Sequence, residues 1–251
     1  MSNKIFDCVT FFQENIQFEL RVNILNHVVD KFIVCESNKH SLQFIKNSFT
    51  EDSISNLFYI WGEEGVGKSY LMKAINKEYR KLNKKTFHLS LENLKALSHM
   101  ILEDLSSMDV ILIERIDCMA NEIEWENKIF SLINGALNSN LRIYISSNVV
   151  AKDLVIGLKD LISRLSYFTG IEIPEISQRE KIEAIKLSAT RKGLKLDDST
   201  INYILNHTSR SLTDLLRLLG DLDSYSLKKK RKINISLVSQ MLRENFNNSH
   251  K

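Results

Sequence analysis

The chain has 251 residues, of which 43% are hydrophobic and 26% are charged, the composition of a folded globular protein. It contains only 8 glycines and a single proline, whereas average usage would give about seventeen and about twelve, and this scarcity disfavours a sandwich or barrel built from many strands and tight turns. The net charge of +3, from 34 basic and 31 acidic residues, is too small to indicate nucleic-acid binding by itself.

Short apolar runs alternate with amphipathic stretches in the region between residues 57 and 173. The runs predicted to be strands are 57–61, 86–89, 110–113, 141–145 and 171–173. The stretches predicted to be helices begin at Lys68, extend from Leu94 to Leu105 and extend from Glu122 to Leu137. Strands that are apolar throughout, with helices between them, indicate a parallel sheet buried on both faces. The predicted fold class is therefore α/β, with a parallel sheet core flanked by helices.

After Pro174 the sequence contains no further apolar run that predicts a strand. Ser177 and Glu180 form a capping-box pattern that opens a helix to about Arg191, and Gly193 ends it. The later stretches predicted to be helical are 199–208, 211–228 and a last one from residue 236. The sequence therefore predicts an N-terminal tail over 1–24, an α/β core over 25–174 and a small all-helical lid subdomain over 175–251.

The cysteine pattern and the hydropathy of the sequence indicate in which cellular compartment the protein is expected. The three cysteines are odd in number, widely separated and not at metal-ligand spacing, which excludes a disulfide framework and a structural zinc site. No apolar run approaches the roughly eighteen residues of a membrane span, and the N-terminus does not have the pattern of a signal peptide. We therefore expect a cytoplasmic protein with no membrane partner.

One motif carries the chemistry: residues 62–69 match G-x-x-x-x-G-K-[ST], between a predicted strand and a predicted helix. Phosphates bind there to inward-turned backbone N–H groups at a helix N-terminus, and glycines leave room for them. Lys68 is expected to reach the β- and γ-phosphates, and the Ser69 hydroxyl is expected to ligate Mg²⁺. The residues predicted to contact the nucleotide, ADP or ATP, are Gly62, Glu64, Gly65, Val66, Gly67, Lys68, Ser69 and Tyr70.

Two further predicted strands end in polar residues. Glu114 ends the run 110–113 and is the acidic residue expected to hold Mg²⁺. Arg115 follows where hydrolysing ATPases have a carboxylate, and because an arginine cannot accept a proton, we expect weak intrinsic hydrolysis at most. Asn148 follows the run 141–145 and suits a sensor of the γ-phosphate, although a plain strand-to-helix cap is an equal alternative.

The order of these parts carries a family resemblance. A P-loop, Ile-Leu-Ile-Glu ending at Glu114, Ile-Ser-Ser-Asn ending at Asn148, Ile-Ser-Arg ending at Arg164 and a helical lid resemble the AAA+ ATPases. More closely, the chain resembles the initiator clade that contains DnaA, and within it the Hda regulators. Residues 30–38 are similar to the clade's segment around the adenine base.

The resemblance implies a role for several residues. Taken alone, Arg164 is typical of a surface arginine on an amphipathic helix; the resemblance implies an arginine finger acting in trans on the nucleotide of a neighbouring DnaA. It places Phe32, Val34 and Asn38 around the nucleotide base. Thr213 stands where the clade has its sensor arginine, and Arg217, one turn later, is the candidate to replace it.

The resemblance also implies partners. Gln17, Phe18 and Leu20 lie in a Gln-Phe-Glu-Leu peptide similar to the one by which Hda regulators bind the DNA polymerase sliding clamp. An extended peptide with a Gln amide and alternate apolar side chains suits a surface pocket, although an edge strand is the alternative for this segment. The implied function is inactivation of DnaA by stimulated ATP hydrolysis. A homodimer is left open.

Two other functions compete with this one. The first is a self-sufficient ATPase resembling a helicase loader, with Glu114 as its catalytic carboxylate. The second is a DNA-binding paralogue of DnaA that uses the basic run 228–232. That run otherwise suits a solvated loop, or contact with the DNA backbone while the protein is on the clamp.

Overall fold

The computed structural model describes residues 34–49, 55–208 and 211–248. They form two compact units. The first contains the described residues of 1–62 and 68–173, and the second contains 63–67 and the described residues of 174–251. Within these ranges no helix is both long enough and apolar enough to cross a membrane.

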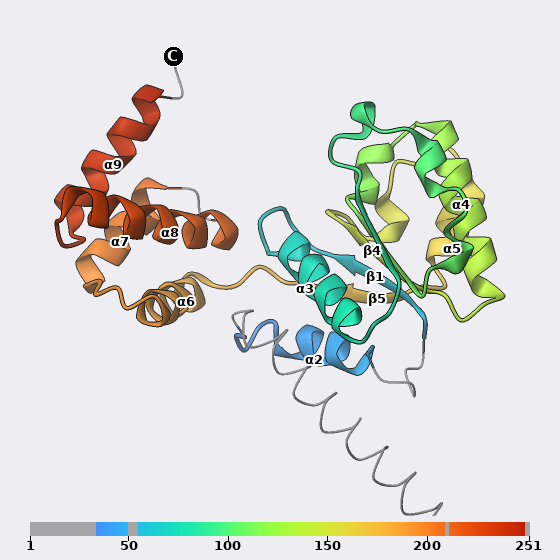
Figure 1. The fold of residues 1–251 in the computed structure, drawn as a ribbon, viewed down its shortest axis with the longest axis horizontal. Coiled ribbons are helices and arrows are strands. Elements are labelled where there is room, and N and C mark those ends of the chain that lie inside the picture. Colours follow the sequence, from blue (N-terminus) through green and yellow to red (C-terminus); the bar gives the residue numbers. More distant parts are fainter. Residues whose placement is uncertain (1–33, 50–54, 209–210, 249–251) are drawn as a thin grey trace, which may run out of the picture. The chain divides into compact units, whose positions relative to one another are not determined.

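The first unit is built on a parallel sheet whose strand order is β2-β3-β4-β1-β5. Its strands are β1 (Leu57–Trp61), β2 (Thr86–Ser90), β3 (Val110–Glu114), β4 (Arg142–Ser147) and β5 (Thr169–Glu172). Its helices are α2 (Lys39–Asn47), α3 (Lys68–Lys81), α4 (Ile123–Leu137) and α5 (Lys159–Leu165). Figure 1 shows α2 and α3 on one face of the sheet, with α4 and α5 on the other. The predicted α/β fold class is confirmed.

The two faces of the sheet have different cores. Every residue of β3 is buried, as expected for a strand covered on both sides. On the α4 and α5 side, aliphatic residues such as Ile111, Ile143 and Ile145 pack with Ile129. On the other side, Phe58 stacks on Tyr144, and the Tyr144 and Tyr79 hydroxyls share a hydrogen bond of 2.9 Å.

The prediction of a helix from Leu94 to Leu105 is wrong. The segment folds as short 3-10 turns over Leu94–Ala96, His99–Leu102 and Leu105–Ser107. Ser98 has an extended backbone and its side chain accepts a hydrogen bond from Met100, while Asp104 adopts the left-handed conformation. Both interrupt a continuous helix, and Leu94, Leu102 and Leu105 are buried in the core of the first unit.

The second unit is helical in its described residues after Pro174, which confirms the predicted helical C-terminal region. Its helices are α6 (Gln178–Arg191), α7 (Asp198–His207), α8 (Leu212–Lys229) and α9 (Ile235–Asn248). The capping box of Ser177 and Glu180 is present at the start of α6, and Gly193, after its end, has φ of +72°. The core contains Ile185, Ile201, Ile204, Leu215, Leu219, Leu222, Val238 and Met241.

Candidate functional site

Most of the predicted site residues follow the carboxyl ends of adjacent strands. Trp61 at the end of β1 leads into the P-loop, Glu114 ends β3, and Asn148 follows β4, which lies between those two strands. Because the strands are parallel, their carboxyl ends meet at one edge of the sheet. Ligands of open α/β sheets bind at this edge.

The P-loop has the backbone that phosphate binding requires. Gly65 and Gly67 have φ of +82° and +102°, which side-chain-bearing residues rarely adopt. Lys68 is the first residue of α3, is buried, and donates from Nζ to the carbonyl oxygen of Gly62 at 2.7 Å. Ser69 is exposed at the N-terminus of the same helix. Glycines in this conformation, a lysine ammonium and a helix N-terminus are the features with which P-loops bind phosphate.

The remaining P-loop positions differ in exposure. Val66 is buried, whereas Glu64 and Tyr70 are exposed. Within the second unit, which contains residues 63–67, Thr213 Oγ1 donates to the Gly65 carbonyl oxygen at 3.2 Å. Arg217 lies on α8, is exposed and forms an ion pair with Asp214. This local pair uses the guanidinium that the sequence assigned to the nucleotide.

Glu114 has a partner that sequence reasoning missed. The carboxylate is only 3% exposed, and its Oε1 lies 2.6 Å from Nε2 of His88 on β2. Nδ1 of His88 lies 3.3 Å from the amide nitrogen of Asn76 on α3. Nothing in the sequence pairs residues 88 and 114, because the pairing depends on β2 lying beside β3.

Asp117 is the second missed residue. Its Oδ2 accepts a hydrogen bond from Arg115 Nε at 3.1 Å, and its Oδ1 accepts one from the backbone N–H of Asn148 at 3.1 Å. Tyr59 donates its hydroxyl to the carbonyl oxygen of Val149 at 2.9 Å, and burial raises the pKa of this phenol, so it stays neutral. These bonds fix the loop after β4 on both sides of Asn148.

The geometry leaves part of Asn148 available. Its side-chain oxygen Oδ1 is buried and has no hydrogen-bond partner within the described residues. An amide oxygen held in this way at the carboxyl edge suits a bond to a water or to another donor. The side chain does not cap the segment after β4 in this structure, because a cap would need Oδ1 to accept a backbone N–H two or three residues further on, and Oδ1 accepts none from the described residues.

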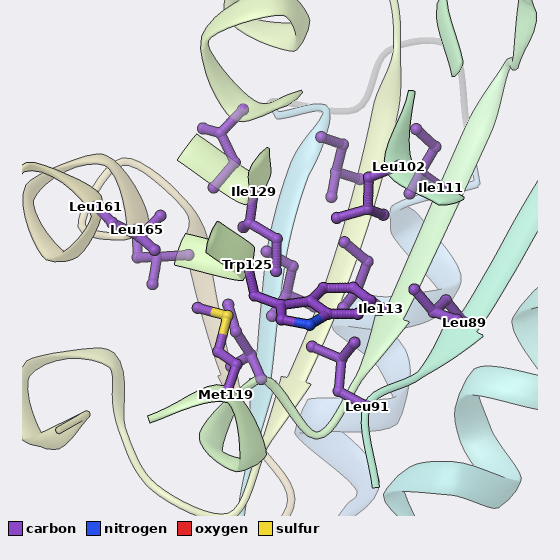
Figure 2. Packing of buried hydrophobic residues seen from close by; sticks show 14 of the residues in the cluster. Leu89, Leu91, Leu102, Ile111, Ile113, Met119, Trp125, Ile129, Leu161 and Leu165 are labelled. Atoms are coloured by element: carbon purple, nitrogen blue, oxygen red, sulfur yellow. The ribbon is translucent and has the colours of Figure 1, made fainter. Parts of the chain in front are cut away.

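Arg164 lies in the last turn of α5 and is half-buried. No carboxylate of the described residues forms an ion pair with it. The helix is held from one side by its apolar residues: Figure 2 shows Leu161 and Leu165 lying against the core that contains Trp125 and Ile129 of α4. The helix that presents the Arg164 guanidinium is therefore held in place by the packing of its apolar residues.

A buried carboxylate anchors the start of the same helix. Glu126 of α4 is 0% exposed, and its two oxygens accept the backbone N–H groups of Gly157 at 3.1 Å and Leu158 at 2.7 Å. Leu158 directly precedes α5. A sequence shows only a Glu in the first turn of a helix, so its role is found only in the structure.

The predicted base-contacting and partner-binding residues are placed only in part. Asn38 is buried, and its Oδ1 accepts the backbone N–H of Cys35 at 2.8 Å. Val34 is exposed. Phe32 and the predicted clamp-binding residues lie outside the described residues; these are Gln17, Phe18 and Leu20.

A magnesium ion at this site would depend on the nucleotide for ligands. Within the described residues, no three His, Cys, Asp or Glu side chains gather closely enough to hold a metal ion. Mg²⁺ is normally held by one or two protein oxygens together with substrate phosphates. Ser69 and Glu114 supply that kind of partial set.

Comparisons with known proteins agree with this geometry. Residues 25–172 match the family model of the bacterial DnaA ATPase domain, and residues 178–242 match that of the Hda lid domain. An uncharacterized protein of Haemophilus influenzae is 29% identical over 198 residues, which is 78% of this chain and 85% of that protein.

Solved structures share the fold. Domain III of the replication initiation protein DnaA from Thermotoga maritima superposes with a TM-score of 0.72 at 15% identity, covering 87% of this chain and 96% of that one. DnaA from Aquifex aeolicus, bound to AMPPCP, superposes with a TM-score of 0.65 at 21% identity, covering 76% of this chain and 64% of that one.

Proposed function

Because the chain belongs to the family of the bacterial DnaA ATPase domain and carries an Hda-type lid, we propose that it regulates replication initiation by inactivating DnaA. In this proposal it binds ADP or ATP with Mg²⁺, docks on the DNA polymerase sliding clamp and stimulates hydrolysis of the ATP held by DnaA. The observation that carries the proposal is Arg164: a guanidinium on an anchored helix with no acidic partner in the described chain.

The P-loop supports the nucleotide part of the proposal. Its N–H groups and Lys68 would bind the phosphates, while Ser69 and Glu114 would hold Mg²⁺. When bound, the magnesium ion would neutralise negative charge on the phosphates. Asn148 would accept a hydrogen bond from a water at its unpartnered Oδ1, or donate one to the γ-phosphate from its amide nitrogen.

The site is poorly suited to hydrolysing its own nucleotide. Arg115 cannot act as a base, and it is engaged by Asp117. Asp117 in turn has both oxygens occupied, by Arg115 and by the Asn148 N–H. We therefore expect turnover of the purified protein far below about 1 s⁻¹, the low end of typical kcat values. A turnover at or above that value would favour a self-sufficient ATPase instead.

Stimulated hydrolysis would take place in the partner. An arginine finger stabilises negative charge on the transferring phosphoryl group and raises rates by about 10³ to 10⁵ where it has been measured in GTPases. The Arg164 side chain would act on DnaA-bound ATP in this way. The protein would bind the sliding clamp through Gln17, Phe18 and Leu20 and would encounter DnaA there.

The finger is tested in a reconstituted assay with clamp, DNA and ATP-bound DnaA. Arg164→Ala should abolish stimulated hydrolysis and leave clamp binding intact. Lys159→Ala, which removes an exposed cation from the same helix, is the matched control and should stimulate normally. Normal stimulation by Arg164→Ala would show that the mechanism is wrong.

Nucleotide and clamp binding are tested separately. Lys68→Ala should weaken ADP binding at least about 100-fold, the loss of a buried charged partner of phosphate, whereas exposed Lys73→Ala on the same helix should not. The clamp should be captured by the wild-type chain and not by the Gln17→Ala/Leu20→Ala variant. Equal capture by both would rule out this peptide as the docking site.

A further inference from the structure

His88 and Glu114 form a buried pair whose register the sheet dictates. In the pairing of β2 with β3, Ser90 is opposite Glu114, and His88 is opposite Leu112. His88 therefore reaches its carboxylate along the diagonal of the ladder, a distance that a long side chain spans. The resulting Nε2 to Oε1 separation is 2.6 Å.

The neighbouring amide fixes the imidazole. The Asn76 amide nitrogen faces His88 Nδ1 at 3.3 Å, and because an amide nitrogen only donates, Nδ1 is the acceptor. The proton of the ring is then on Nε2, where it is donated to Glu114 Oε1. The ring orientation and the tautomer are both determined by contacts from α3 and β3.

The pair also links the two residues expected to hold magnesium. Ser69 and Asn76 lie on the same helix, α3, two turns apart and so on a similar side of it. The Asn76 amide contacts His88, and His88 contacts Glu114. A chain of polar contacts thus connects the helix that presents Ser69 to the strand that presents Glu114.

We propose that His88 is a positioning residue for the magnesium-binding carboxylate of Glu114, and that Asn76 in turn positions His88. This inference rests on the proposed binding of a magnesium nucleotide. A carboxylate buried to this extent needs a hydrogen-bond donor. His88 is that donor, and its hydrogen bond restricts rotation of the Glu114 carboxylate before the magnesium ion binds. Outer partners of metal ligands typically contribute 10- to 100-fold to metal affinity.

The test measures ADP affinity by calorimetry with saturating MgCl₂ and again with EDTA, so the readout is binding and not activity. The quantity compared is the ratio of the two dissociation constants. For the wild type, Mg²⁺ should tighten ADP binding. His88→Leu should reduce that magnesium-dependent gain about 10-fold or more and leave affinity in EDTA unchanged, whereas His88→Gln should restore part of the gain because its amide can donate to Glu114.

Two further variants keep the result interpretable. His99→Leu is the matched control: His99 is also paired with a glutamate, the exposed Glu124 at 3.1 Å, and its removal should not change the ratio. Asn76→Ala should lower the gain by a smaller factor than His88→Leu, and it tests the chain of contacts without removing the donor to Glu114.

The outcomes separate the inference from the proposed function. If Glu114→Gln loses the magnesium-dependent gain while His88→Leu and Asn76→Ala keep it, Glu114 holds the ion and the positioning role of His88 is wrong. If Glu114→Gln also keeps the gain, or the wild type shows none, the magnesium site itself is wrong and the inference fails with it.

Discussion

The carboxylate of Glu126 should be a main support of the first unit. Glu126 is wholly buried, and each of its oxygens accepts a backbone N–H, from Gly157 and from Leu158. A hydrogen bond to a charged group contributes about 1.5–3 kcal/mol net. Glu126→Gln keeps one acceptor and turns the other into an NH₂ group that faces an N–H donor.

We therefore expect Glu126→Gln to lower the free energy of unfolding by about 2 kcal/mol: one lost bond, partly offset because a neutral amide costs less to bury than a carboxylate. This is a large part of the roughly 5–15 kcal/mol that stabilises a typical domain. Urea denaturation followed by tryptophan fluorescence would measure it. Both tryptophans, Trp61 and Trp125, belong to the first unit, and Trp125 is adjacent to the substituted residue.

Glu124→Gln is the matched control. Glu124 also lies in the first turn of α4, so both variants lose the same interaction with the helix dipole. Its side chain is 73% exposed and pairs only with His99 among the described residues, so the expected loss is within about 0.5 kcal/mol. The reasoning is refuted if the two variants have the same stability within that margin, or if amide exchange at Gly157 and Leu158 is not accelerated in Glu126→Gln.

Three other predictions concern the fold. In the second unit, Gly193→Ala should lower the free energy of unfolding by about 1 kcal/mol because φ is +72° there. Gly220→Ala inside α8 should raise it by about 0.5–1 kcal/mol, because alanine favours a helix more than glycine does. Calorimetry that gave a change of the same sign for both variants would contradict this. Ser177→Ala should cost about 1 kcal/mol by removing the capping box of α6, as measured by the same method. Burial raises the pKa values of Tyr79 and Tyr144, so the unfolded state loses these protons first and stability should fall as pH rises above about 10. Tyr144→Phe should show a shallower fall in urea midpoint over that interval, and an equal fall would contradict the assignment.

Several features are local, and the sequence alone determined them. The P-loop between an apolar strand and a helix, the five apolar runs of the sheet and the capping box before α6 each depend on residues close together in the chain. The spacing of apolar residues and the hydrogen bonds of helix-capping residues involve only one or two turns of chain, so they can be recognised without tertiary information. The α/β class and the helical C-terminal region followed from them.

The same local reasoning failed over residues 94–105. There the apolar residues occur at spacings that fit a helix, yet extended and left-handed backbone at Ser98 and Asp104 divides the segment into short turns. Leu94, Leu102 and Leu105 are nevertheless buried in the core of the first unit. Tertiary packing overrides a weak local preference in such segments.

Only the tertiary structure decided which polar groups meet. Glu114 was identified as the acidic end of a strand, but its partner His88 is 26 residues away and becomes a neighbour only because β2 and β3 are adjacent and parallel. Glu126 reaches Gly157 across 31 residues for the same kind of reason. Sequence patterns record the chemistry of each side chain and the period of its own element, whereas hydrogen-bond pairing depends on strand order and helix packing, which are properties of the whole fold.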